Sequence, residues 1–170
     1  MSTTTTPAIY VACLASYNDG ILHGKWINDL SDKKTIWTEI KEILASSPIE
    51  GAEEWAIHDY EGFGNMEICE YSSIDFIHQA SDLICEHGEE LISELYSNLS
   101  CLDACRAALD EDYIGCYDTI EDYAEQYVQE CYDIPNNIAF YIDYKRFARD
   151  LEIDLLVINL GYEVHLFHYR

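Results

Sequence analysis

The spacing of apolar residues along the chain predicts strands first and helices later. Ala8–Ala15, His23–Ile27 and Glu54–Tyr60 carry β-formers with a period of two, which predicts three strands. Between the second and third of these, Asp32 can cap a helix. The N-terminal part is therefore expected to run β-β-α-β. The apolar face of its helix consists of Ile36, Trp37, Ile40, Ile43 and Leu44.

From Tyr71 the apolar positions follow the three-and-four spacing of helices, interrupted at Gly88 and at Ser97-Asn98. The successive stripes contain Ile74, Ile77, Leu83, Ile84, Leu91, Ile92, Leu95, Leu102, Cys105 and Leu109. Near the end of the chain, Asp143 can cap another helix. Ile153–Asn159 and Tyr162–Tyr169, joined near Gly161, predict a closing hairpin.

The stretch Asp110–Asp133 is dense in carboxylates and tyrosines and contains no lysine or arginine. A helix from about Thr119 would give it one buried stripe and one face toward water. The expected buried stripe is Ile120, Tyr123, Ala124, Tyr127, Val128 and Cys131. The expected outer face is Glu121, Asp122, Glu125, Gln126, Gln129 and Glu130. Glu121 and Glu125 would then lie roughly 6 Å apart along the axis, a spacing of the same order as that of phosphates in nucleic acid.

These elements predict an α+β fold made of three small units and elongated overall. The expected boundaries are 1–71 for an N-terminal α/β unit, 72–109 for a helical middle unit, and 110–170 for a C-terminal α/β unit that ends in the hairpin. With 170 residues, of which 49% are hydrophobic, the chain can bury a real core, and its fourteen tyrosines argue against a disordered acidic tail.

The distribution of charge adds to this interpretation, because the net charge of −24 is concentrated in one part of the chain. The segment from Glu42 to Tyr144 holds 25 acidic residues and one basic residue, Arg106, whereas the flanks together hold 8 of each. Duplex DNA carries one charge per about 1.7 Å, so this imbalance matches roughly 40 Å, or about 12 base pairs. The sequence therefore suggests a surface made for a DNA-binding protein.

A solvated surface kept for solubility is the ordinary explanation of acidic residues, and adaptation to high salt is another. Adaptation to salt would spread the charge over the whole chain. Solubility does not require like charges three or four residues apart on helices, where each pair costs about 0.2–0.5 kcal/mol. Eight such pairs are expected: Asp82–Glu86, Glu86–Glu89, Glu86–Glu90, Glu90–Glu94, Asp118–Glu121, Asp118–Asp122, Glu121–Glu125 and Asp122–Glu125.

The start of the chain has no positive segment followed by an apolar run, and no apolar run is long enough to span a membrane. We therefore expect a cytoplasmic protein. Seven cysteines in such a chain favour free buried thiols over a disulfide framework. Cys101 and Cys105 share a helical face, but a single pair is poor zinc spacing, so core packing is expected for them and no metal site is expected.

Several short runs resemble the ArdA family of antirestriction proteins carried by plasmids and conjugative transposons. They are IYVACLASYNDGILHGKW near the start, EEWAIHDYEGF with His58, Asp59 and Tyr60, YSSI from Tyr71, CYDTIEDYAE, and IPNNIAFYIDYKRFARDL from Ile134. They come in the order of the family and at similar separations, and the likeness covers most of the chain.

The resemblance implies a homodimer that mimics bent DNA and fills the groove of a type I restriction-modification enzyme, on its specificity and methyltransferase subunits. Neither a cofactor nor catalysis is implied. The carboxylates expected to contact the enzyme are Glu86, Glu90, Glu94, Asp110, Glu111, Asp112, Asp118, Glu121, Asp122, Glu125, Glu130 and Asp133. The family's antirestriction motif and dimer surface would include Tyr132, Pro135, Tyr141, Asp143 and Tyr144.

Two alternatives stand beside this prediction. A carboxylate-based hydrolase could use His58 with Asp59 and Glu61, although neighbouring residues on a strand point to opposite faces. Divalent cations could bind the carboxylates, although no calcium-loop pattern is present. For His23, His78, His87, His165 and His168, ordinary structural roles are expected.

Overall fold

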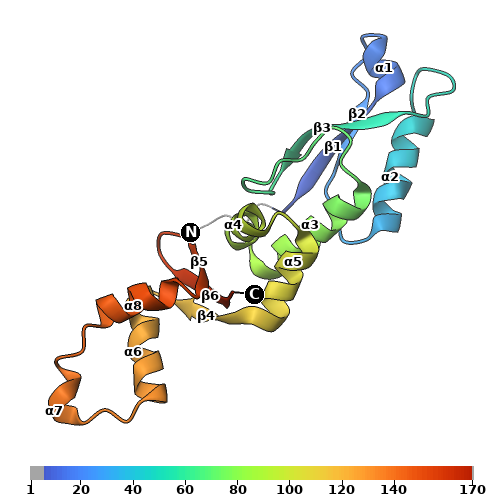
Figure 1. Cartoon of the computed structure of the whole chain (residues 1–170). Helices are drawn as coiled ribbons and strands as arrows, with labels where there is room; N and C mark the ends of the chain where they lie inside the picture. The colour runs from blue at the N-terminus through green and yellow to red at the C-terminus, as the bar shows by residue number, and fades with distance from the viewer. Residues whose placement is uncertain (1–5, 170) are drawn as a thin grey trace. The chain divides into compact units, whose positions relative to one another are not determined.

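The computed structural model describes residues 6–169. Internal contacts group the chain into two compact units, unit 1 up to Leu102 and unit 2 from Asp103 (Figure 1). Each unit combines helices with a three-stranded antiparallel sheet, which confirms the α+β class. The finer division at 71/72 and 109/110 stays a prediction.

The sheet of unit 1 contains β1 (Ala8–Cys13), β2 (Gly24–Ile27) and β3 (Trp55–Glu61) in the order β2-β1-β3. β1 is central and mostly buried, because its Ala, Ile and Val side chains are covered on both faces. The expected β-β-α-β order is confirmed, with one difference. The backbone turns into the short helix α1 (Leu14–Asn18) where the strand was expected to continue to Ala15.

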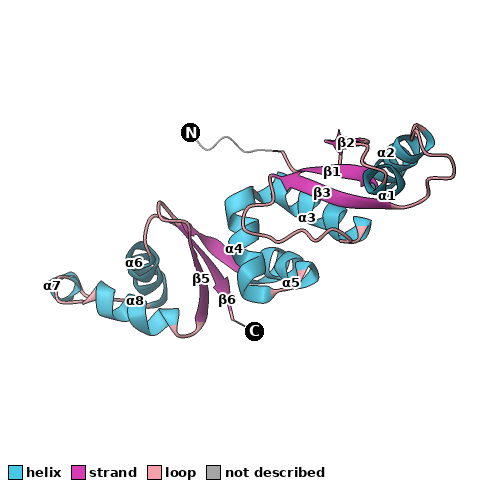
Figure 2. Ribbon diagram, turned by 90° about the horizontal axis from the view of Figure 1, so that it is seen from above, coloured by secondary structure: helices cyan, strands magenta, loops and turns pink. Residues whose placement is uncertain are grey.

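Three amphipathic helices complete unit 1: α2 (Lys33–Ala45), α3 (Ile74–His87) and α4 (Glu89–Leu99). Their apolar stripes lie where the spacing predicts, since Ile36, Ile77 and Leu95 are all fully buried. α2 packs against β1 and β2, and α3 packs against both α2 and α4 (Figure 2). Gly88, at a positive φ of 95°, separates α3 from α4 and breaks what would otherwise be one helix.

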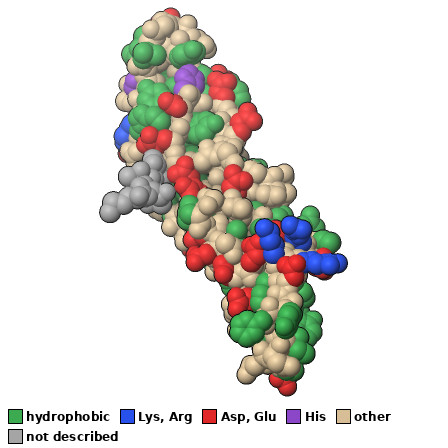
Figure 3. All heavy atoms as spheres, turned by 90° about the vertical axis from the view of Figure 1, so that its left-hand side faces the viewer, with side chains coloured by type: hydrophobic (Ala, Val, Ile, Leu, Met, Phe, Trp, Pro, Cys, Tyr) green, Lys and Arg blue, Asp and Glu red, His purple; other side chains and the backbone are tan. Residues whose placement is uncertain are grey.

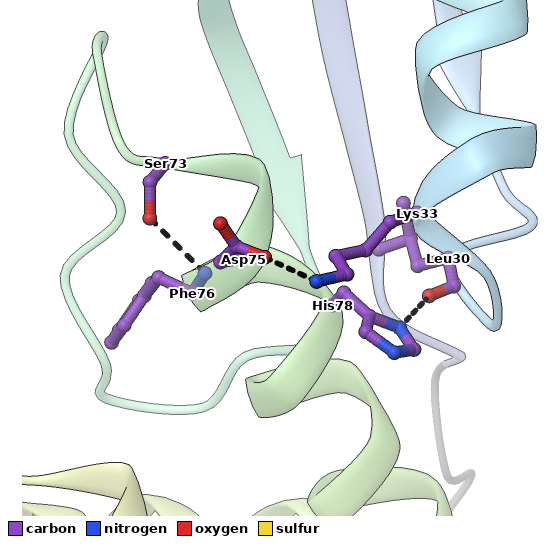
Figure 4. Close-up of polar contacts among 6 residues, drawn as sticks. All are labelled: Leu30, Lys33, Ser73, Asp75, Phe76 and His78. Atoms are coloured by element: carbon purple, nitrogen blue, oxygen red, sulfur yellow. Dashed lines mark hydrogen bonds and ion pairs between the residues drawn. The ribbon is translucent and has the colours of Figure 1, made fainter.

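Polar contacts fasten α3 to α2 and the loop before it (Figure 4). Lys33 Nζ lies 2.6 Å from Asp75 Oδ1, and His78 Nδ1 lies 2.8 Å from the carbonyl oxygen of Leu30. Ser73 caps α3 by accepting a hydrogen bond from the amide of Phe76. The expected structural role of His78 is thus confirmed.

Unit 2 begins with α5 (Leu102–Ala107), whose first residue closes unit 1, and the π-helical turn η1 (Ala108–Asp112). The chain continues through β4 (Tyr113–Tyr117), α6 (Ile120–Cys131), the short α7 (Asn136–Ala139), α8 (Tyr144–Glu152), β5 (Leu155–Asn159) and β6 (Val164–His168). The sheet order is β4-β6-β5. The predicted hairpin is confirmed as β5–β6, whereas β4 was not predicted.

Several burial expectations are wrong. Cys131 is exposed because it is the last residue of α6, and Glu121 is half-buried rather than open to water. Trp37 is 42% exposed. The seven cysteines, all within residues 6–169, form no disulfide, as expected, but only Cys13 and Cys105 are buried. Within residues 6–169, the helices are too short or too polar to cross a membrane.

Candidate functional site

Helix α6 is anchored in unit 2 by its aromatic face. Tyr123, Ala124 and Val128 are buried, and the helix packs against α8 and β4. The ring of Tyr127 lies 6.1 Å from that of Phe147 on α8, and the ring of Tyr123 lies 5.1 Å from that of Tyr117. Burial, followed by the charges of neighbouring tyrosines, raises the pKa of Tyr123. This packing fixes which side of α6 faces outward.

The outward side of α6 carries the predicted carboxylates Asp122, Glu125 and Glu130, all exposed. Amide side chains one turn away hold two of them: Gln129 donates to Glu125 at 3.2 Å, and Gln126 donates to Glu130 at 2.8 Å. Each carboxylate keeps further acceptor positions for a partner. The face is therefore acidic and ordered at the same time.

The first turn of α6 offsets part of its negative charge. Thr119 accepts a hydrogen bond from the amide of Asp122 at 3.2 Å, and its hydroxyl donates to the Asp122 carboxylate at 2.5 Å. Glu121 and Asp122 also lie at the positive end of the helix dipole. The predicted start of the helix near Thr119 is thus confirmed, and Thr119 is its N-cap.

The expected number of repulsive helical pairs is too high. Gly88 separates Glu86 on α3 from Glu89 and Glu90 on α4, so Glu86 is not a helical neighbour of either. Asp118 precedes the cap of α6, so its pairs with Glu121 and Asp122 do not lie within the helix. Four pairs remain on a single helix: Asp82–Glu86, Glu90–Glu94, Glu121–Glu125 and Asp122–Glu125. These four pairs cost about 1–2 kcal/mol in total, half of what eight pairs would cost. This smaller cost is easier to reconcile with a surface kept only for solubility.

The remaining predicted carboxylates of unit 2 lie on short or irregular segments rather than on one helix face. Asp110, Glu111 and Asp112 belong to the π-helical turn η1, where Asp112 is half-buried. Asp118 lies between β4 and α6 and is exposed, as is Asp133 just after α6. The acidic residues of unit 2 therefore continue along the chain before and after α6.

In unit 1, Glu86 and Glu90 are exposed on α3 and α4, whereas Glu94 is half-buried. Asn65 donates a hydrogen bond to Glu94 at 2.8 Å. Glu89, outside the predicted set, accepts from the amide of Gly64 at 2.9 Å. These bonds tie α4 to the loop after β3, so Glu94 has a structural role that its spacing alone did not indicate.

Basic side chains are arranged differently in the two units. Lys25 and Lys33 form ion pairs with Glu39 and Asp75, neither of which belongs to the predicted set. In unit 2, α8 carries three exposed basic residues, Lys145, Arg146 and Arg149. On the face shown in Figure 3, Asp and Glu side chains are scattered widely, whereas most of the Lys and Arg atoms in view gather in one cluster.

The segment between α6 and α8 exposes large apolar side chains. Phe140 is 93% exposed and Tyr141 is 86% exposed, with Tyr132 and Ile138 also open to solvent. Pro135 is exposed and precedes α7, whereas Tyr144 is half-buried. Asp143 caps α8 by accepting from the amide of Arg146 at 3.0 Å, as predicted. Phe140 and Ile138 were not among the predicted residues, because apolar residues in a loop sequence carry no period that separates buried from exposed.

His58, the centre of the hydrolase alternative, has partners other than those this chemistry needs. Its ring lies 4.7 Å from that of Tyr17 in an edge contact, and its Nε2 lies 3.8 Å from Glu70 Oε1. His58 is also the extra residue of a β-bulge, since Tyr10 pairs with Asp59 while Val11 pairs with Ile57. The strict alternation expected for His58 and Asp59 is therefore wrong at this point.

Residues that could hold a metal ion occur in unit 2, where the sequence suggested none. Ligand atoms of Cys116, Glu163 and His165 lie within 4.8 Å of one another. Among these atoms, His165 Nε2 lies 3.2 Å from Glu163 Oε1. Desolvation, followed by the hydrogen bond to Glu163 and its charge, raises the pKa of the Cys116 thiol. Sequence spacing could not reveal this cluster, because it depends on the pairing of β4 with β6.

Comparison with known proteins identifies one family. A family model described as Antirestriction protein (ArdA) matches residues 9–164, which is nearly the whole chain. A search of curated proteins gave no match.

Proposed function

Because the chain belongs to the ArdA family of antirestriction proteins, we propose that it protects incoming DNA by mimicking DNA. In this proposal its carboxylates occupy the DNA-binding groove of a type I restriction-modification enzyme, on the specificity and methyltransferase subunits. The protein acts in the cytoplasm by occupancy and performs no chemistry. Modification by the same complex falls together with restriction, because both activities need the groove.

The observation that carries this proposal is the outer face of α6. Asp122, Glu125 and Glu130 are exposed and fixed by the packing of Tyr123 and Val128 on the opposite side. Glu121 and Glu125 lie on the same helix four residues apart, which corresponds to about 6 Å along the axis of a regular helix. Such an array can meet the Lys and Arg side chains that contact phosphates.

A displacement experiment tests the proposal. The methyltransferase core of a type I enzyme is bound to fluorescently labelled DNA containing its target, and the purified protein is added. We expect loss of the DNA complex near stoichiometric protein, since the groove cannot hold both ligands. Undiminished DNA binding at a large excess of protein would contradict the proposal for the enzyme tested.

We also propose that the protein works as a homodimer formed through the segment between α6 and α8. Phe140 and Tyr141 leave nearly all of their side-chain surface open, which is unfavourable for a lone chain and typical of protein interfaces. Tyr132, Pro135 and Tyr144 flank them, and the cap at Asp143 fixes where α8 begins. A dimer would double the number of carboxylates offered to the enzyme.

Phe140→Asp tests the dimer by sedimentation of the full chain. We expect the wild type to sediment as a dimer at micromolar concentration and the variant to dissociate. Leu22→Asp is the matched control, because Leu22 is 90% exposed but lies in unit 1. A monomeric wild type, or equal dissociation of both variants, would contradict this interface.

The family also suggests where the gene resides. We propose that it belongs to a mobile element, such as a plasmid or a conjugative transposon, because protection from restriction benefits DNA that enters a new cell. Transfer of a plasmid with and without this gene into a host with a type I enzyme measures that benefit directly. Equal transfer in both cases would count against it.

A further inference from the structure

The pairing of β4 with β6 brings three residues with metal-binding side chains onto one face of the sheet of unit 2. Cys116 is directly opposite His165 in the antiparallel register. Glu163 is the residue before β6, and its carboxylate reaches the same side, because Glu163 Oε1 lies 3.2 Å from His165 Nε2. Directly opposed residues have Cβ atoms about 4.5–5.5 Å apart, which places both side chains within reach of one ion.

A β-bulge adds a fourth residue to this face. Tyr113 pairs with Phe167 and Gly115 with Leu166, so Ile114 is an extra residue in β4. In a regular strand, Tyr113 would lie three residues before Cys116 and would point to the opposite side. With the bulge, the Tyr113 hydroxyl lies 3.0 Å from His165 Nδ1, and the two rings stack at 5.9 Å.

We propose that Cys116, Glu163 and His165 form a binding site for a divalent transition-metal ion of the zinc class. Their sulfur, oxygen and nitrogen atoms are the donors that Zn²⁺ takes, whereas Mg²⁺ and Ca²⁺ require oxygen ligands. Metal-to-ligand distances of about 2.0–2.3 Å in a tetrahedral shell separate ligand atoms by about 3.3–3.8 Å. The 3.2 Å between His165 Nε2 and Glu163 already approaches this spacing, and small side-chain rotations bring in Cys116.

Tyr113 supplies the outer contact that a metal-bound histidine needs. His165 forms a hydrogen bond with Glu163 through Nε2 and with Tyr113 through Nδ1. When Nε2 binds the ion, Nδ1 carries the ring proton and donates to the Tyr113 oxygen. Cys116 binds as thiolate, so its thiol proton passes to solvent and the ring stays neutral. One proton is thus released for each ion bound.

The site is open enough for an ion to enter. Cys116 is exposed, and the Glu163 side chain keeps 33% of its surface accessible, whereas that of His165 keeps only 11%. The histidine thus provides a fixed, buried anchor, and a water molecule can complete the shell from the solvent side. A bound ion would tie β4 to β6 and to the turn that precedes β6. This inference does not depend on the proposed function.

Titration with Co²⁺ tests the site, because a thiolate bound to Co²⁺ gives a charge-transfer band that carboxylates cannot give. The full chain is kept reduced with a phosphine, and excess Mg²⁺ occupies the surface carboxylates. We expect one equivalent of Co²⁺ to bind with this band, and Zn²⁺ to displace it. Cys116→Ser should lose the band. Cys131→Ser, which removes another exposed thiol of unit 2, should keep it.

Two further variants distinguish a proposed metal ligand, Glu163, from a residue that positions a ligand, Tyr113. Glu163→Gln should weaken Co²⁺ binding by at least about ten-fold, since even the loss of an outer-shell partner costs about 10–100-fold. Tyr113→Phe should keep the band and lose affinity within that range. Absence of a saturable thiolate band, its survival in Cys116→Ser, or unchanged affinity in Glu163→Gln would each overturn the proposal.

Discussion

At the scale of single residues, helix caps decide how the acidic segments begin. Thr119 has two hydrogen bonds with Asp122, one to its amide and one to its carboxylate. Thr119→Ala removes both. We expect the substitution to lower the free energy of unfolding by about 1 kcal/mol, which is the typical contribution of an N-cap to stability. Urea denaturation of the full chain measures the change.

Thr38→Ala is the control for this prediction. Thr38 is an exposed residue of α2 whose hydroxyl donates to the carbonyl oxygen of Lys34, a bond within the helix that adds little to stability. The same threonine-to-alanine change there should leave the free energy of unfolding nearly unchanged. Equal losses in both variants would mean that the cap of α6 is not the cause.

Local residue patterns were the most predictable part of the molecule. Asp32 and Asp143 were assigned as caps from the sequence, and each accepts the expected backbone hydrogen bond. The helix expected from about Thr119 begins there, with Thr119 as its N-cap. A cap depends on residues three positions apart, so the sequence contains what is needed. The exposure of Cys131 was not predictable in this way, because it depends on where α6 ends.

At the scale of the element, α6 should make the stability of the protein sensitive to alkaline pH. The pKa of Tyr123 is raised in the folded state, chiefly by burial, so the neutral phenol is favoured there. Its contribution to stability is complete below the unfolded pKa of about 10 and is lost as the pH rises through the folded value. We expect Tyr123→Phe to reduce the alkaline loss.

The measurement is the free energy of unfolding in urea at neutral pH and above pH 10. The Tyr123→Phe variant should show a smaller difference between the two than the wild type. Tyr141→Phe, which changes an exposed ring of the same unit, is the control and should behave like the wild type. An identical pH dependence in all three proteins would show that Tyr123 ionisation is not involved.

The carboxylates of α6 should act together rather than through one anchor. Changing Glu121, Asp122, Glu125 or Glu130 singly to its amide should cost about 0.2–1 kcal/mol of binding to the restriction enzyme. All four changes together should reduce affinity by several-fold to hundreds-fold. The free energy of unfolding should change little, because lost helix-dipole contacts and relieved like-charge pairs nearly cancel.

A second set of four substitutions distinguishes the α6 surface from total charge. Asp19, Glu50, Asp150 and Asp154 are exposed carboxylates outside the predicted set. Their conversion to amides removes the same net charge and should have a smaller effect on inhibition. One substitution on α6 that abolishes inhibition in a folded protein would instead indicate a discrete site.

Elements were predictable wherever their own periodicity carried the signal. The stripes of α3, α4 and α6 and the β5–β6 hairpin follow from spacing and from nearby turn residues. β4 was missed because it is five residues long, contains Gly115, and is defined by pairing with a strand near the end of the chain. The bulges at His58 and Ile114 depend on partner strands in the same way.

At the scale of the whole molecule, charge was predictable and its arrangement was not. The net charge of −24 can be read from the composition, and together with the family it is the basis of the proposed DNA mimicry. Which carboxylates face outward depends on packing: Glu121 and Glu94 are half-buried, whereas Asp122 and Glu90 are exposed. Substitutions that test the predicted site should therefore distinguish the exposed carboxylates from the half-buried ones.

The last prediction concerns how salt affects binding to the restriction enzyme. If the protein replaces DNA, its carboxylates meet the Lys and Arg side chains of the groove, and mobile ions screen these pairs. The logarithm of the association constant should fall linearly with the logarithm of salt concentration, as it does for DNA. We expect at least about a ten-fold loss between low and moderately high salt, because several pairs form at once. The four-amide variant of α6 should show a shallower slope, since it forms fewer pairs. Direct titration of the methyltransferase core with labelled protein measures both slopes. An affinity independent of salt, or equal slopes for wild type and variant, would show that contacts other than the α6 carboxylates govern binding.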